Sequence, residues 1–191
     1  MKEIETEHFR IIFTEDSRNM AQEIYENAEN SYAFLVSFFG EDPDLFLPVY
    51  INEEEKVFNA YFTQFPYNRI VVFNAPIDPS LDNGRSPIAL TFLHELTHAF
   101  TYSFKGKLGD FLVSVFGDWA NFPPSLHMLS FLSEGIAVYM ESRGGEGRLN
   151  DPFFYSDLAA AKGEDISYLD ASGGRDIKPG ANMWYSYGGP F

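Results

Sequence analysis

Apolar residues divide the first third of the chain into a strand, a helix and a second strand. Residues 8–13 are rich in β-branched and aromatic side chains, which predicts a strand. From Ser17 to Phe39 apolar residues recur at helical spacing, and Gly40 ends the predicted helix. Leu47 to Ile51 predicts the next strand. Because such a unit joins its strands through a right-handed crossover, we expect two parallel neighbours in one sheet.

A third apolar run, from Arg69 to Asn74, predicts a strand that ends at Pro76. A loop and a strongly apolar helical segment follow it, so we expect this strand to border a cleft. If its edge is exposed, Val72, Phe73 and Asn74 are candidates to pair with the backbone of an extended peptide. An ordinary buried strand has the same apolar run, so that alternative stays open.

The second half of the chain is predicted to be mainly helical. The apolar stripe in Lys105–Pro124, flanked by Gly and Pro, favours a short helix that covers the core or the cleft over an element that touches a membrane. Another helix is expected from about Ser125 to Ser142, and loops and short helices are expected after it. These elements together predict one α+β domain over residues 1–191 with a small mixed sheet.

Composition excludes several classes of protein. The formal net charge of −15 argues against binding to nucleic acid or to anionic membranes. The absence of cysteine excludes disulfides and thiolate metal sites, and leaves the compartment undecided. No apolar run approaches the roughly 20 residues of a membrane span. Residues 1–7 also lack the pattern of a signal peptide.

The segment Thr91–Phe100 carries the clearest chemical pattern, His-Glu-x-x-His. Because residues i and i+4 lie on one face of a helix, His94 and His98 can direct ring nitrogens at one ion. Glu95 is rotated by about 100° from His94, which places its carboxylate beside that ion. Two neutral nitrogen ligands and a nearby carboxylate base are the arrangement of a zinc hydrolase. The alternative is a buried helix whose polar side chains are satisfied by hydrogen bonds.

Catalytic zinc takes a third protein ligand, for which the candidates are His127, Glu134, Glu141 and any carboxylate that the fold brings to the site. Glu134 and Glu141 lie seven residues apart in an apolar helical segment, hence on one face. A buried glutamate without a partner is costly, and coordination of a metal gives its ionised form a partner. Glu134 is therefore the favoured third ligand.

The sequence resembles the gluzincin metallopeptidases, and among them the peptidase MA-like group related to the aminopeptidase-N and thermolysin families. The resemblance is carried by HELTH at His94–His98, EGIAVYME at Glu134–Glu141, WYSYGGPF at Trp184–Phe191, and the opening strand and helix that end in Phe38-Phe39-Gly40. It implies a zincin-like fold and hydrolysis of a peptide or protein substrate. It also implies one Zn²⁺ held by His94, His98 and Glu134. Glu95 would then be the general base.

The resemblance also suggests roles for three further residues. A tyrosine three residues before a glycine stabilises the oxyanion in related peptidases, which makes Tyr185 the candidate and Tyr187 the second choice; packing near a chain end is the alternative. Glu141 is expected to accept an N–H from a ligating imidazole. Family likeness favours an extracytoplasmic location, although no feature of the chain itself does.

Two departures from the family pattern refine these expectations. The Gly-x-Met-Glu-Asn signature that holds a free amine in aminopeptidases is replaced here by Val72-Phe73-Asn74-Ala75-Pro76, so an endopeptidase is favoured. The 105–124 segment lengthens the gap before Glu134. The chain also ends at Phe191, shortly after Gly188-Gly189, as expected of a domain truncated at its C-terminus. A weakly active zinc-binding regulatory domain, a structural domain with a vestigial site and a hydrolase of non-peptide bonds remain alternatives.

Overall fold

The computed structural model describes residues 1–77, 86–103 and 130–150 of the chain. The chain divides into two compact units, Met1–Phe122 and Pro123–Phe191, and each is described by itself. The organisation as one domain over residues 1–191 stays a prediction. None of the helices in the described ranges combines the length and the apolar character needed to cross a membrane.

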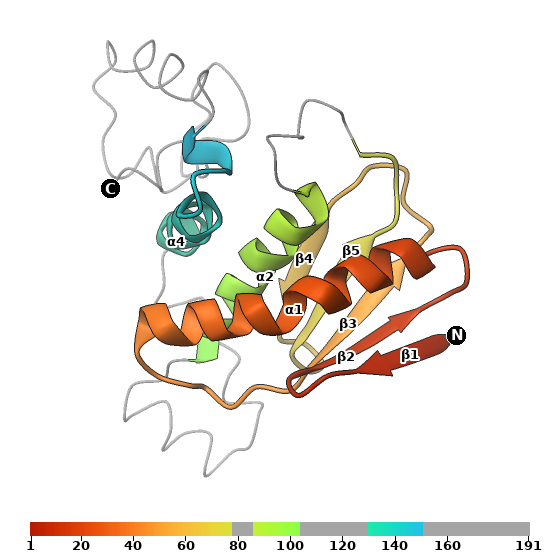
Figure 1. Cartoon of the computed structure of the whole chain (residues 1–191), viewed down its shortest axis with the longest axis horizontal. Coiled ribbons are helices and arrows are strands. Elements are labelled where there is room, and N and C mark those ends of the chain that lie inside the picture. The colour runs from red at the N-terminus through yellow and green to blue at the C-terminus, as the bar shows by residue number, and fades with distance from the viewer. Residues whose placement is uncertain (78–85, 104–129, 151–191) are drawn as a thin grey trace. The chain divides into compact units, whose positions relative to one another are not determined.

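The first unit contains a five-stranded mixed sheet in the order β1-β2-β3-β5-β4 (Figure 1). The strands are β1 (Lys2–Glu5), β2 (Phe9–Phe13), β3 (Leu47–Asn52), β4 (Ala60–Thr63) and β5 (Arg69–Phe73). Strands β2, β3 and β5 run parallel, whereas β1 and β4 are antiparallel to their neighbours. The predicted parallel pairing of the first two apolar strands is confirmed, as is the α+β class.

Two helices, α1 (Arg18–Phe39) and α2 (Pro87–Ser103), pack against the sheet and each other on one face (Figure 1). Alternate residues of the strands point to that face, so Phe9, Ile11 and Phe13 of β2 are buried whereas Arg10 is exposed. Aromatic side chains join the layers: the Phe9 and Phe92 ring centroids lie 5.4 Å apart. The resulting core packs α2 against the sheet.

Gly40 ends α1 in the left-handed conformation, with φ of 73°, and its N–H donates to the carbonyl of Val36 at 2.8 Å. No atom lies within 4 Å of the position that a Cβ would take. Only backbone strain therefore opposes a side chain, and Gly40→Ala should lower the free energy of unfolding by about 1–2 kcal/mol in urea denaturation. Gly40→Asn should lose less, because asparagine tolerates this conformation. Equal stability of wild type and Gly40→Ala would contradict this explanation of the helix end.

The order of the strands corrects the prediction that β5 borders the cleft with an exposed edge. β5 lies between β3 and β4, so the expectation that Arg69–Asn74 has an exposed edge is wrong. The Phe73 N–H donates to the Asn59 carbonyl at 2.8 Å, and the Asn74 N–H donates to the Asn52 carbonyl at 2.7 Å. Backbone pairing of a peptide with Val72, Phe73 and Asn74 is thereby excluded, and β5 is the ordinary buried strand that the sequence also allowed. The outer strand at this end of the described sheet is β4.

The described part of the second unit consists of α4 (Ser130–Ser142) and a short 3₁₀ helix, Arg148–Asn150. α4 confirms the predicted second helix from residue 130 onward. Asn150 ties the 3₁₀ turn back to α4, since its side-chain amide donates to the Ser142 carbonyl at 2.7 Å. The predicted helix in Lys105–Pro124 and the C-terminal segment with Tyr185 lie outside the described residues.

Candidate metal centre

The His-Glu-x-x-His segment lies in the middle of α2, and Ser86 and Pro87 set where this helix begins. The Ser86 Oγ accepts the N–H of Ile88 at 3.1 Å, as an N-cap side chain does. Pro87 occupies the first helical position, where the N–H it lacks would have no partner within the helix. Every residue of α2 from Phe92 to Phe100 is buried. The motif is therefore held in the core of the unit.

His94 and His98 direct their rings toward each other from successive turns of α2. Their Nε2 atoms lie 3.2 Å apart, and the ring planes are inclined at 81°. Both side chains are buried, at 3% and 7% relative exposure. Two nitrogens bound to one tetrahedral zinc at 2.0–2.1 Å would be about 3.3 Å apart. The observed separation fits two ligands of one ion; an N–H···N hydrogen bond between the rings has a similar length.

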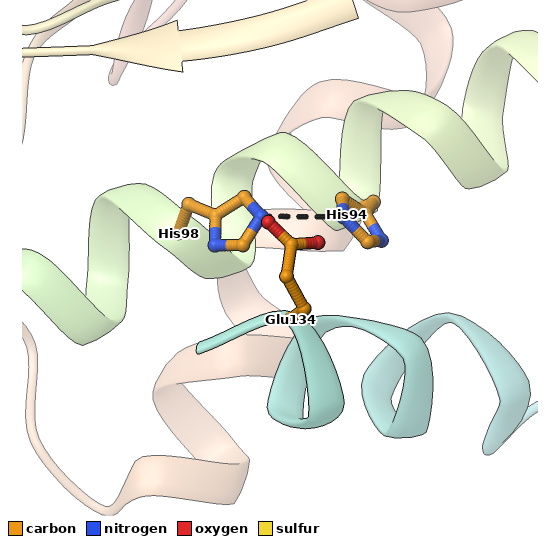
Figure 2. A group of neighbouring side chains, drawn as sticks. All are labelled: His94, His98 and Glu134. Atoms are coloured by element: carbon orange, nitrogen blue, oxygen red, sulfur yellow. Dashed lines mark hydrogen bonds between the residues drawn. The ribbon is translucent and has the colours of Figure 1, made fainter. Parts of the chain in front are cut away.

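Glu134 of α4 belongs with this histidine pair in a group of residues that could hold a metal ion (Figure 2). His94, His98 and Glu134 each offer one ligand atom, and these atoms lie within 4.8 Å of one another. Of the other candidates for a third ligand, His127 lies outside the described residues and Glu141 is not part of the group.

Glu95 is buried at 7% relative exposure and accepts a hydrogen bond from a distant strand. The backbone N–H of Phe62 in β4 donates to its Oε2 at 2.8 Å. Glu95 is not a member of the grouped metal-binding residues. Its carboxylate is thus bonded to β4 and is not one of the three grouped ligands.

Glu141 has a contact that the sequence did not suggest. Its carboxylate is buried, and Oε1 lies 3.3 Å from the Nε of Arg148 and 3.4 Å from the backbone N–H of the same residue. These contacts join α4 to the 3₁₀ turn. The role of Glu141 as an acceptor for a ligating imidazole stays a prediction, and so do the roles of Tyr185 and Tyr187, which lie outside the described residues.

A second group of potential ligands, Glu7, His8 and Glu29, lies at the start of β2 and is partly exposed. The Nδ1 of His8 lies 2.7 Å from Glu29 Oε2, and its backbone N–H donates to Oε1 at 3.0 Å. Partial burial would raise the pKa of Glu29, but hydrogen bonds from Thr6 and His8 outweigh it and lower that pKa. Tyr32 stacks on the His8 ring at 3.7 Å. These contacts join the start of β2 to α1, which gives the three residues a structural role without a metal.

Comparisons with known proteins identify one relative and leave the function open. The chain is 28% identical to an uncharacterized protein of Treponema pallidum (strain Nichols) over 197 aligned positions. The alignment takes in 98% of this chain and 17% of that protein, so the chain spans about a sixth of its relative's length. No protein-family profile and no solved structure matches the chain.

Proposed function

We propose that this chain is a zinc-dependent peptidase of the gluzincin type, with a zincin-like fold, that hydrolyses internal peptide bonds. The observation that carries the proposal is the pair of buried imidazole nitrogens 3.2 Å apart on α2. The adjacent Glu95 carboxylate and the Glu134 carboxylate supply the two acidic groups that this chemistry needs.

The donor set fits zinc better than the other common metals. Two imidazoles and one carboxylate are the ligands of catalytic zinc sites that keep a fourth position open. Mg²⁺ and Ca²⁺ prefer oxygen ligands alone, and the chain has no cysteine to form a thiolate site. When bound, zinc would supply Lewis-acid chemistry, lowering the pKa of a water and polarising the scissile carbonyl.

The chain's own residues would then handle the proton. Glu95 accepts a proton from the attacking water at a carboxylate oxygen and delivers it to the nitrogen of the leaving amine. The Phe62 N–H donates to Oε2 of the same carboxylate and fixes its position. Burial of Glu95 among apolar residues of α2 keeps bulk water from competing for the proton.

The substrate backbone would bind along β4, the outer strand, in place of the strand expected from the sequence. The outward N–H of Ala60 already donates to Asn59 Oδ1 at 2.9 Å, and that of Phe62 donates to Glu95. The carbonyls of Ala60 and Phe62 point the same way as these N–H groups. An extended peptide would thus be held through its own N–H groups, donated to these two carbonyls.

A peptide library analysed by mass spectrometry tests the proposal. Zinc-loaded protein should cleave a set of extended peptides at internal bonds, with cleavage lost on chelation and restored by Zn²⁺. Peptides that are N-methylated at the residues pairing with β4 should resist cleavage, because they lack the required donor. Zinc-loaded protein that cleaves no peptide would contradict a peptidase and indicate a zinc-binding domain instead.

A further inference from the structure

The contact between Glu95 and β4 joins two segments that lie 33 residues apart in the sequence. The donor is the backbone N–H of Phe62, and the acceptor is the buried carboxylate of Glu95, the residue that follows His94. Hydrogen bonds from N–H groups to an ionised carboxylate are shorter and about twice as strong as those between neutral groups. A backbone donor in a strand is also fixed in direction, because it has no side-chain rotamer to lose.

The pairing of β4 with β5 shows why this N–H is available. The Phe73 N–H donates to the Asn59 carbonyl, which makes those two residues a hydrogen-bonded pair. In an antiparallel ladder such pairs alternate with non-hydrogen-bonded ones, so Tyr61 bonds to β5 whereas Phe62, opposite Ile70, does not. The Phe62 N–H therefore points away from β5. In the described sheet no further strand lies on that side, and the Glu95 carboxylate of α2 accepts the hydrogen bond from this N–H.

The side chain of Phe62 makes a second contact with the same helix. Its ring is stacked on Tyr102, with centroids 6.1 Å apart and planes inclined at 14°. The Tyr102 ring in turn lies 6.2 Å from that of His98. Phe62 thus holds α2 at two points, one on the carboxylate and one next to a histidine of the pair. A displacement of β4 would therefore shift both the Glu95 carboxylate and the surroundings of His98.

We propose that Phe62 is the positioning residue for the catalytic base: its backbone N–H holds the Glu95 carboxylate at the angle needed for proton transfer. The inference rests on the proposed function, since a base needs positioning only if the reaction occurs. It assigns to β4 a role beyond binding the substrate, because the strand that pairs with the peptide also orients the base that takes the proton from the attacking water. Base and substrate are thereby aligned by one rigid element.

Amide hydrogen exchange followed by NMR on the zinc-loaded protein tests the contact without measuring activity. Replacing Glu95 by Ala should raise the exchange rate of the Phe62 amide by about tenfold or more, since its acceptor is lost. The amides of Tyr61 and Thr63 are internal controls, because they are bonded to β5 and should keep their exchange rates. An unchanged rate at Phe62 would overturn the proposal.

A pair of variants tests the catalytic consequence. Phe62→Pro and Phe62→Ala both remove the ring, but only proline removes the N–H, and an outward-facing position on an outer strand accepts proline. The proline variant should retain zinc and show a kcat lower than that of the alanine variant by on the order of 10- to 100-fold, with a smaller change in KM. Equal kcat values would overturn the proposal. If zinc-loaded wild type cleaves no peptide, the proposed function fails, and the exchange measurement still decides whether Phe62 holds Glu95.

Discussion

Glu95→Gln should abolish most of the hydrolytic activity and leave the zinc in place. The amide oxygen of glutamine can still accept the Phe62 N–H, so the contact with β4 and the fold are retained. The amide cannot take a proton from water at neutral pH, and loss of a general base lowers kcat by on the order of 10²–10⁴-fold. The kcat is measured by steady-state kinetics on a peptide that the wild type cleaves, and the zinc content is measured on the same sample.

The informative comparison for Glu95→Gln is between activity and metal content. A variant with wild-type kcat would remove Glu95 from the mechanism. Loss of zinc together with activity would instead make Glu95 part of the metal site, which is contrary to its exclusion from the grouped ligands. Thermal unfolding should give similar midpoints for both proteins, since the substitution keeps the size of the side chain and its hydrogen bond.

Replacing a metal ligand should have the second large effect, which is the loss of bound zinc. Glu134→Ala and His98→Ala should each reduce zinc from about one ion per chain to a small fraction after dialysis, because a catalytic site has only three protein ligands. Activity should fall in parallel. Unlike Glu95→Gln, these variants are expected to lose both properties together, as measured by elemental analysis and peptide cleavage.

The second group of potential ligands provides the matched control for these variants. His8→Ala removes an imidazole that, like His98, belongs to a group of potential ligands, but His8 is engaged with Glu29 through both its ring Nδ1 and its backbone N–H. Zinc content should therefore remain at about one ion per chain in His8→Ala. Retention of zinc by His98→Ala and its loss from His8→Ala would move the metal site to Glu7, His8 and Glu29.

The histidine pair was predictable because its geometry is local. Both residues lie on one helix, and a spacing of four residues fixes their relation by the helical period. The burial of α2 also followed from the sequence, since apolar residues surround the motif on most sides. The same holds for β2, α1, β3 and β5, whose apolar periodicity extends over five or more residues.

The outer strand could not be predicted in the same way. β4 has only four residues, Ala60–Thr63, and lies between a charged loop and Pro66. Without it, β5 was the last strand visible in the sequence and was assigned the exposed edge. The Phe62–Glu95 hydrogen bond was missed for the same reason, because a contact between residues 33 positions apart depends on the strand order and not on local pattern.

Zinc K-edge X-ray absorption on the loaded protein tests the central claim most directly. The account predicts about one zinc per chain, with two imidazole nitrogens at roughly 2.0–2.1 Å, oxygen ligands at a similar distance and no sulfur. His98→Ala should lose the spectrum or one imidazole from it. Protein that retains no zinc under any loading condition, or a spectrum that contains oxygen ligands alone, would contradict the account.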